Sequence, residues 1–280
     1  MSHRSPLDQQ DLIARLAQGE PAALAPLFAT HAASVRRLAM AITRDAAASD
    51  EVVQETFVRV MEAARTFDPS RGEPRAWLLA IARNLARAER RAPREIPSGD
   101  DEEPLSHLAV DAGWGASSPE RLVSGAEDAE RIARALASLS SSDREVLVLR
   151  DLDDLAPEDV ARVLDVPVAS AKSRLHRARL RLLAALRSEE AGVSASERTV
   201  GGMTCSEVLA HLSDFVDRAL GPTDEARVRA HLVGCTVCER FGGRYAGAVS
   251  ALRTELGAAP AVDARVLDDL MVRLGARGAR

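Results

Sequence analysis

The spacing of apolar residues constrains the fold of this 280-residue chain most strongly. In Val52, Val53, Phe57, Val60 and Met61, as elsewhere, apolar side chains recur at i, i+3, i+4 and i+7, which places one apolar stripe on a helix. Aromatic residues make up only 3% of the chain, so a core has to be built from Ala, Leu and Val. This alphabet favours helices over strands. The sequence therefore predicts an all-α fold.

Breaks in the pattern divide the chain into three small helical domains joined by polar linkers. The domains are predicted over residues 8–94, 128–187 and 203–280. Residues 95–127 carry eight acidic and one basic side chains, together with Pro, Gly and Ser, and show little periodicity. Repulsion among the acidic side chains predicts a linker that stays extended. Residues 188–202 form a second polar linker.

Several classes of protein are disfavoured by what the sequence lacks. No stretch approaches the roughly 18 apolar residues of a membrane span, and no apolar segment follows the N-terminal charges as in a signal peptide. We therefore expect a cytoplasmic protein without a membrane partner. Three cysteines argue against a disulfide framework. The sequence shows no phosphate loop, Ser/His/Asp constellation or open metal site, so no enzyme is predicted.

A helix-turn-helix is predicted within residues 157–187. Pro157 suits the first turn of a helix that runs to about Leu164, and a break at residues 165–167 precedes a helix from about Ser170 to Arg187. Between residues 169 and 187 there are six cationic and no acidic side chains. One side of the helix is apolar, so that the other side is able to meet phosphates and base edges. A merely solvated basic face is the alternative.

The segment 136–186 resembles region 4 of the extracytoplasmic-function (ECF) sigma factors. The resemblance rests on Leu-Ser-Ser-Ser-Asp-Arg-Glu-Val-Leu-Val-Leu-Arg and on Ala-Lys-Ser-Arg-Leu-His-Arg-Ala-Arg. In that family the domain reads the −35 promoter element, which implies DNA-facing positions at Ser170, Lys172, Ser173, Arg174 and Arg177. Asp165 stands where a turn glycine is usual, and Ala169 replaces another glycine. Because Asp tolerates positive φ, we expect the turn to survive.

Residues 10–94 resemble region 2 of the same family. The matching motifs are Asp-Glu-Val-Val-Gln-Glu-Thr-Phe-Val-Arg-Val at 50–60, Phe-Asp-Pro at 67–69 and Arg-Ala-Trp-Leu-Leu-Ala-Ile-Ala-Arg-Asn-Leu at 75–85. The resemblance implies that one helix docks on core RNA polymerase through Glu51, Gln54, Glu55 and Arg59. Without the resemblance, a solvated helix face would be the preferred interpretation.

The resemblance also implies that the loop at residues 67–75 and the following helix recognise the −10 element. Its candidate DNA-binding residues are Arg83, Asn84 and Arg87. Capturing a separated strand requires cations and stacking surfaces. The spacing of Trp77 with Leu78 favours a core position over a stacking platform.

All three cysteines lie in the last domain. His231, Cys235 and Cys238 are spaced four and three residues apart, and Cys205 lies upstream. These residues predict a closed Cys3His site for one structural or regulatory Zn²⁺. The alternative is three buried apolar cysteines and an ordinary histidine.

The segment from Cys205 to Cys238 resembles the zinc-binding anti-sigma domain, which is normally a separate protein that silences a sigma factor. The resemblance implies an alternative sigma factor whose partners are core RNA polymerase, promoter DNA and, within the chain, its own C-terminal domain. A last amphipathic helix is predicted from Val262 to Leu274. Two alternatives remain open: a DNA-binding regulator that does not engage polymerase, and a thiol or zinc redox sensor. The zinc site is equally compatible with a purely stabilising role.

Overall fold

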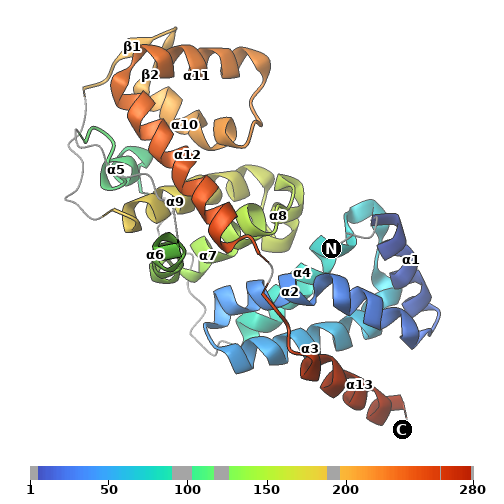
Figure 1. Ribbon diagram of the computed structural model, residues 1–280. Coiled ribbons are helices and arrows are strands. Elements are labelled where there is room, and N and C mark those ends of the chain that lie inside the picture. The colour runs from blue at the N-terminus through green and yellow to red at the C-terminus, as the bar shows by residue number, and fades with distance from the viewer. Residues whose placement is uncertain (1–5, 90–102, 117–125, 188–195, 259, 279–280) are drawn as a thin grey trace. The chain divides into compact units, whose positions relative to one another are not determined.

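The structure, a computed structural model, describes residues 6–89, 103–116, 126–187, 196–258 and 260–278. Its regular structure is almost entirely helical, which confirms the all-α prediction (Figure 1). The α-helices are α1 (Pro6–Ala17), α2 (Leu24–Thr43), α3 (Ala46–Ala63), α4 (Pro74–Glu89), α5 (Leu105–Asp111), α6 (Ala126–Ser138), α7 (Ser141–Leu147), α8 (Pro157–Leu164), α9 (Val168–Ala185), α10 (Cys205–Val216), α11 (Pro222–Gly234), α12 (Thr236–Leu256) and α13 (Ala264–Gly278). Short helical turns are η1 (Pro21–Ala23), η2 (Ala64–Thr66), η3 (Pro69–Arg71) and the π-helical η5 (Val148–Leu152). No helix in the described ranges is long and apolar enough to cross a membrane.

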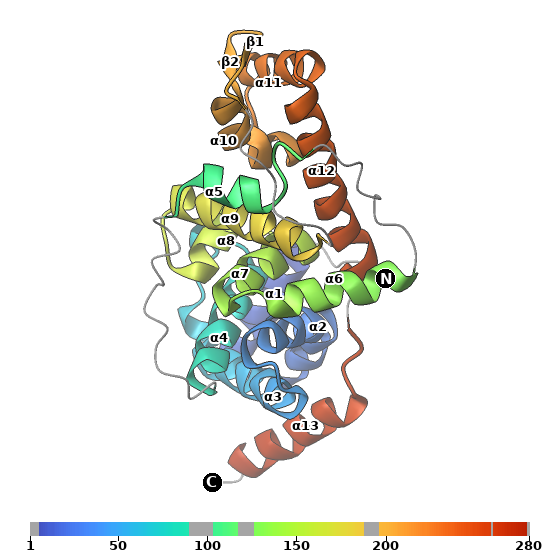
Figure 2. The same cartoon turned by 90° about the vertical axis from the view of Figure 1, so that its left-hand side faces the viewer.

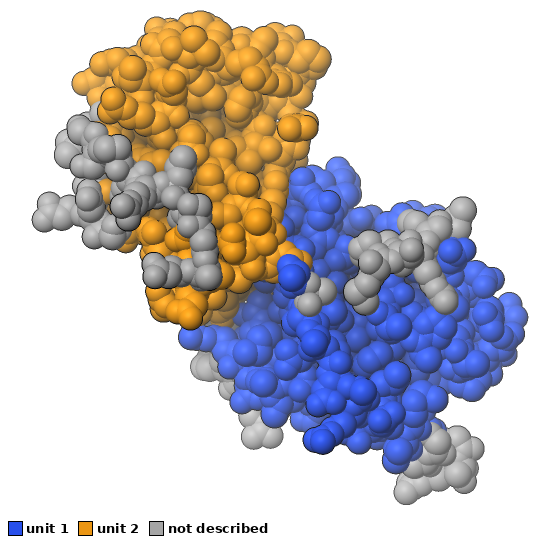
Figure 3. Space-filling view, viewed as in Figure 1, with its two compact units in different colours: residues 1–94, 148–171, 258–280 blue, residues 95–147, 172–257 orange. Residues whose placement is uncertain are grey.

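The chain forms two compact units, which Figure 3 shows in different colours. Unit 1 comprises residues 1–94, 148–171 and 258–280, and unit 2 comprises residues 95–147 and 172–257. These units cut across the domains predicted from the sequence. The segment 128–187 contributes to both units, and the end of the segment 203–280 belongs to unit 1.

The core of unit 1 is a bundle of α2, α3 and α4. Arg44 ends α2 in the left-handed conformation, and the carboxylate of Asp45 caps α3 by accepting the N–H of Ala48 at 2.8 Å. The rings of Phe28 and Phe57 meet inside the bundle, with centroids 4.9 Å apart. Four residues of the predicted apolar stripe, Val52, Val53, Phe57 and Val60, are therefore on the buried face of α3, whereas Met61 is half-buried.

Two segments from later in the chain complete unit 1. Helix α8 packs on α4, and α13 packs on α3, beside which it lies in Figures 1 and 2. Val266 and Leu270 of α13 are buried, whereas Met271 and Val272 are exposed. The predicted amphipathic helix thus buries its apolar stripe against the first helical bundle.

The turn between α8 and α9 has the geometry that the sequence predicts. Pro157 occupies the first turn of α8, and Asp165 ends the helix with φ of 54° and ψ of 53°. The N–H of Val166 donates to the carbonyl of Ala161 at 3.0 Å, which satisfies one of the last carbonyls of α8. Asp165 therefore adopts the left-handed conformation usually reserved for glycine.

Unit 2 contains a helix within the segment predicted to be an extended linker. Leu105–Asp111 form α5, which packs on α10, and Leu108, Ala109 and Trp114 are buried. The expectation of an extended chain is wrong here, because these apolar residues have a surface to pack against. Residues 100–102, which carry most of the acidic run, lie outside the described residues.

A short β-hairpin interrupts the second predicted linker. Strand β1 (Thr199–Val200) pairs antiparallel with β2 (Met203–Thr204), and Gly201 and Gly202 form the turn with φ of 60° and 74°. Positive φ at both central residues is typical of a type I′ turn, which glycine adopts without strain. The hairpin leads directly into α10 and packs on α11.

The bundle of unit 1 should depend strongly on Phe57, which is fully buried. We expect Phe57→Ala to lower the free energy of unfolding by about 3–5 kcal/mol, since it removes apolar contacts and leaves a cavity. Urea unfolding followed by circular dichroism measures this change. The exposed Glu62→Ala on the same helix should change stability by less than about 0.5 kcal/mol. A loss at Phe57 as small as that control would contradict the packing of this core.

Candidate metal centre and nucleic-acid interface

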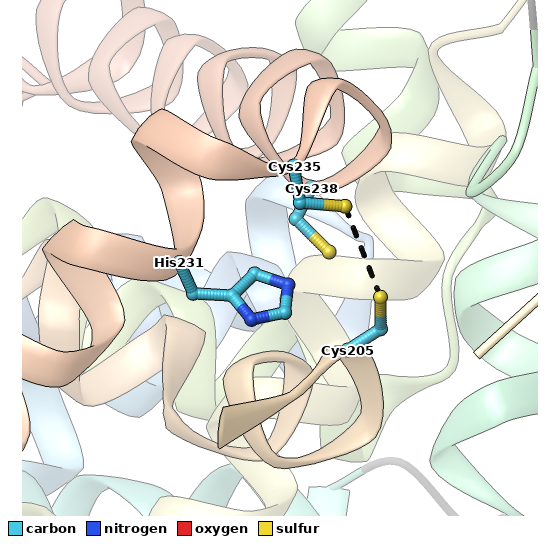
Figure 4. Close-up of side chains that lie close together, drawn as sticks. All are labelled: Cys205, His231, Cys235 and Cys238. Atoms are coloured by element: carbon cyan, nitrogen blue, oxygen red, sulfur yellow. Dashed lines mark hydrogen bonds between the residues drawn. The ribbon is translucent and has the colours of Figure 1, made fainter. Parts of the chain in front are cut away.

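Four predicted metal ligands lie together in unit 2. The ligand atoms of Cys205, His231, Cys235 and Cys238 are all within 4.8 Å of one another, and all four residues are buried (Figure 4). Cys205 is the first residue of α10, His231 lies in the last turn of α11, and Cys238 lies in the first turn of α12. Cys235 joins α11 to α12 in an extended conformation, with φ of −126°. This break between two helices, rather than one continuous helix face, brings the later three ligands together.

The backbone of the hairpin orients the His231 ring. Nδ1 lies 2.9 Å from the carbonyl of Met203 and 3.2 Å from that of Val200, so it donates its proton to the backbone. Nε2 is buried and has no hydrogen-bond partner among the described residues. This tautomer leaves the lone pair of Nε2 available as a ligand, which is the usual arrangement of a metal-binding histidine. A capping box between Thr204 and Glu207 fixes the start of α10, and with it Cys205.

The sulfur atoms are arranged as in a closed four-ligand site. Sγ of Cys205 and Sγ of Cys235 are 3.9 Å apart and not bonded to each other. Two thiolates at about 2.3 Å from one tetrahedral ion would be about 3.8 Å apart. Burial raises the pKa of Cys238 and, less strongly, that of Cys205, which keeps these thiols protonated without a cation. The donor set and its geometry therefore fit a metal ion.

Cys235 differs from the other two thiols. Burial opposes its ionisation, but hydrogen bonds, of which that from the backbone N–H of Cys238 is the strongest, lower its pKa to about 7. The cluster therefore contains one thiol that ionises readily.

The predicted DNA-reading residues lie on α9. Ser173 is exposed, and Ser170, Lys172, Arg174 and Arg177 are half-buried. The cations of this helix have partners inside unit 2: Lys172 pairs with Asp214 at 3.2 Å, Arg181 with Asp143 at 3.0 Å, and Arg177 and Arg187 donate to the carbonyls of Glu103 and Asp111. Acidic and carbonyl oxygens thus surround a face predicted to meet phosphates.

Arg179, one of the six cations counted between residues 169 and 187 but not one of the predicted DNA-facing residues, points into the interior of unit 2. Its side chain is fully buried and donates to Oγ of Ser213 at 2.8 Å and to both carboxylate oxygens of Asp217 at 2.9 and 3.1 Å. Arg253 of α12 pairs with the same carboxylate at 2.7 Å. Arg179 is therefore an anchor for α10. The acidic residues three apart on α10, Asp214 and Asp217, were the sequence signal for this contact.

His176, also on α9, faces α12. Its Nδ1 lies 3.0 Å from the hydroxyl of Tyr245, and the two rings are 5.8 Å apart. Burial, followed by the charges of Arg179 and Arg177, lowers the pKa of His176 to about 4, although Asp214 opposes the shift. The imidazole is therefore neutral at physiological pH.

The predicted −10 residues on α4 lie in two environments. Asn84 and Arg87 are exposed, whereas Arg83 is buried and donates to the carbonyl of Val163 in α8 at 3.2 Å. Trp77 is half-buried and packs on Phe67, with ring centroids 5.2 Å apart. The ring thus packs within unit 1, as the spacing favours.

The predicted polymerase-facing residues share the outer side of α3. Glu51 and Arg59 are exposed, and Gln54 and Glu55 are half-buried. Arg59 pairs with Glu55 at 3.0 Å. Arg273 of α13 donates to Oε1 of Gln54 at 2.8 Å and lies 4.0 Å from the Glu55 carboxylate. The last helix therefore covers part of this side of α3.

Three segments of the chain match known protein families. Residues 27–95 match the family "Sigma-70 region 2", residues 129–182 match "Sigma-70, region 4", and residues 205–238 match "Putative zinc-finger". The ECF RNA polymerase sigma factor SigL of Mycobacterium tuberculosis is 32% identical over 164 residues, which cover 58% of this chain and 88% of SigL. RNA polymerase sigma factor CnrH of Cupriavidus metallidurans is 32% identical over 177 residues, or 62% and 92% of the two chains. A solved structure of CnrH in complex with the cytosolic domain of CnrY is 28% identical, covers 65% of this chain and 99% of that one, and has a TM-score of 0.47.

The buried His176 should make the stability of the fold depend on pH. The pKa of His176 in the folded state is below its ordinary value. The contribution of the neutral imidazole to the free energy of unfolding is therefore complete above about pH 6.5 and is lost as the pH falls towards 4. Because of this group, we expect the free energy of unfolding to be about 2 kcal/mol lower at pH 5.0 than at pH 7.5. His176→Gln should reduce the pH dependence of urea unfolding by that amount. The control is His211→Gln, a change at a half-buried histidine. Equal pH dependence in both variants would refute the role of His176 in the pH dependence of stability.

Proposed function

The chain belongs to the ECF sigma factors of the sigma-70 family, and we propose that its own C-terminal part controls its access to promoter DNA and core RNA polymerase. As an alternative sigma factor, the protein is a transcription initiation factor and not an enzyme. The observation that carries the proposal is that residues after position 203 pair with side chains predicted to serve DNA and polymerase.

In this proposal three helices divide the work of initiation. Helix α9 reads the −35 element through Ser170, Lys172, Ser173, Arg174 and Arg177. Helix α4 engages the −10 element through Arg83, Asn84 and Arg87, and α3 docks on core polymerase through Glu51, Gln54, Glu55 and Arg59. Long cationic side chains on α9 suit both phosphate and base-edge contacts, so we expect binding to weaken steeply with salt.

The Cys3His cluster is proposed to hold one structural Zn²⁺ through Cys205, His231, Cys235 and Cys238. Three thiolates and an imidazole leave no open position on a four-coordinate ion, so the metal would supply cross-linking rather than catalysis. It would join the N-terminus of α10 to the junction of α11 and α12. Because α10 carries Asp214 and Asp217, the metal would also support the contact with α9.

Helix α10 is proposed to compete with DNA for α9. The carboxylates of Asp214 and Asp217 contact Lys172 and Arg179, with the charge and hydrogen-bonding capacity that a DNA phosphate would offer. The ammonium group of Lys172 cannot pair fully with Asp214 and with a DNA phosphate at the same time. The −35 contact therefore requires that α10 release at least this part of α9.

Helix α13 is proposed to compete with polymerase for α3. It buries Val266 and Leu270, and its Arg273 engages Gln54 and Glu55. A tether within one chain gives such a helix an effective concentration of roughly millimolar, so a weak contact suffices to keep α3 covered. The helix thus adds a second restraint to that of α10.

The metal proposal predicts the behaviour of single-ligand variants. The purified protein should contain one zinc per chain, and Cys205→Ser, Cys235→Ser or Cys238→Ser should each abolish tight retention, because the site has no spare ligand. Inductively coupled plasma mass spectrometry after extensive dialysis measures the content. His211→Asn, on α10 but outside the cluster, should retain a full equivalent. Wild-type protein without zinc would exclude the site, and a Cys variant that keeps a full equivalent would refute this ligand set.

The α13 proposal is tested by placing a charge where the helix is buried. Leu270→Asp should displace α13 and raise the affinity for core RNA polymerase by about tenfold or more, whereas the neighbouring exposed Met271→Asp should not. Fluorescence anisotropy with labelled full-length protein measures both affinities.

The outcomes of this experiment separate the two parts of the proposal. If wild type and both variants bind polymerase equally, the chain is a sigma factor that α13 does not restrain. If no variant binds polymerase, although all bind DNA, the protein is a DNA-binding regulator of another kind, and the sigma function fails.

A further inference from the structure

A buried ion-pair cluster in unit 1 has no role in the function proposed so far. Asp153, in the turn between η5 and α8, has a side chain only 2% exposed. Its Oδ1 accepts from Oγ of Ser34 at 2.9 Å, from Arg37 at 3.2 Å and from Arg75 at 2.7 Å. Ser34 and Arg37 lie on α2, and Arg75 lies in the first turn of α4. We call these four residues the Asp153 clasp.

The clasp is one of several contacts by which residues 148–171 lie on the first helical bundle. Arg37 also donates to the carbonyl of Leu152 at 2.9 Å, and Arg83 donates to that of Val163 at 3.2 Å. The guanidinium of Arg162 lies against Gly72, where φ is 141° and a Cβ atom would collide with it. The segment 148–171 therefore contacts α2, the loop at residues 67–75 and α4.

The loop at residues 67–75 and α4 are the surface assigned above to the −10 element. A separated DNA strand needs access to this surface for its bases to stack and its phosphates to meet cations. In this structure Arg83, one of the predicted DNA-binding residues, is buried under α8, and Gly72 is covered by Arg162. Single-stranded DNA and residues 148–171 therefore compete for the same groups.

The chemistry of the clasp suits a contact that opens. Burial raises the pKa of Asp153 above its ordinary value, even though Arg75 and Arg37 lower it, so the charged carboxylate pays a large desolvation cost in the closed form. Its Oδ2 is buried with no hydrogen-bond partner among the described residues. When the segment moves away, water is able to solvate all three charged side chains. Opening an interface of this kind costs less free energy than opening an apolar interface of equal area.

We propose that the Asp153 clasp is a latch that holds residues 148–171 over the −10 surface and closes that surface to single-stranded DNA. The inference rests on the proposed assignment of the −10 surface to α4 and the loop before it. The latch lies within the two sigma regions and involves neither the Cys3His cluster nor α13. Because α8 leads through the Asp165 turn into α9, opening the latch frees the −10 surface and the first helix of the helix-turn-helix together, whereas the restraint of α10 on α9 remains.

The latch is tested in the full-length protein with Asp153→Ala and a matched control. Asp154→Asn removes the charge of the neighbouring carboxylate, which is 92% exposed, and Asn tolerates the left-handed backbone of this residue, with φ of 50°. Binding of a fluorescent single-stranded 12-mer of random sequence is measured by anisotropy, and hydrogen–deuterium exchange is followed for residues 148–164. Asp153→Ala should raise DNA affinity by about tenfold and speed exchange in this segment, and Asp154→Asn should leave both unchanged.

A second variant guards against misfolding of the first. Arg37→Met removes one partner of Asp153 from α2, away from the predicted DNA-binding residues, and should have the same effects to a smaller degree. Faster exchange without a gain in DNA affinity would overturn the occlusion, and unchanged exchange in both variants would overturn the latch. Core polymerase binding by Leu270→Asp, measured in parallel, reports on the sigma function itself. A failure of the latch is therefore distinguishable from a failure of the proposed function.

Discussion

The packing of unit 2 depends on one buried guanidinium group. Arg179 is fully buried, and a charge in that position is tolerable only when it is neutralised and fully hydrogen-bonded. Asp217 supplies the bidentate carboxylate, and Ser213 a further acceptor. These partners belong to α10, so the basic helix α9 has a complete interior environment only while α10 is present. The tyrosine that meets His176 and the acid that meets Lys172 lie on the same C-terminal domain.

The proposed restraints on the sigma surfaces are of two physical kinds. At α3 the contact joins an apolar stripe, centred on Leu270, to a rim arginine. At α9 and at the Asp153 clasp the contacts are ionic and buried. Apolar contacts are insensitive to salt, whereas charged groups respond to competing ions and to phosphates. In the proposed mechanism, nucleic acid would therefore compete with the ionic contacts, and polymerase would compete with the apolar contact at α3.

Local sequence patterns predicted much of the fold and part of the candidate site. The stripe of α3, the start of α8 at Pro157 and the left-handed Asp165 depend on neighbours within a few residues, and the structure agrees with each. The sequence also predicts the four candidate metal ligands, because their residue types and spacing have few other uses. In the structure these four residues lie together. Helix α5 was missed because its apolar residues gain a partner only in the tertiary structure. The burial of Arg179 and the clasp at Asp153 depend on acidic residues and arginines that are tens of residues apart in the sequence. A local sequence pattern does not predict which of these residues pair.

The attachment of α10 and α9 to one polypeptide has a consequence for the cell. Each ribosome that makes α9, the proposed recognition helix, also makes α10, whose side chains pair with it, so the two are always produced one to one. Neither gene copy number nor uneven translation changes that ratio, and under the proposed restraint basal activity would be buffered against expression noise. For the same reason, the proposed restraint by α10 could not be removed by degrading a separate protein. A signal has to act on the geometry of the intact molecule, or cut it in two.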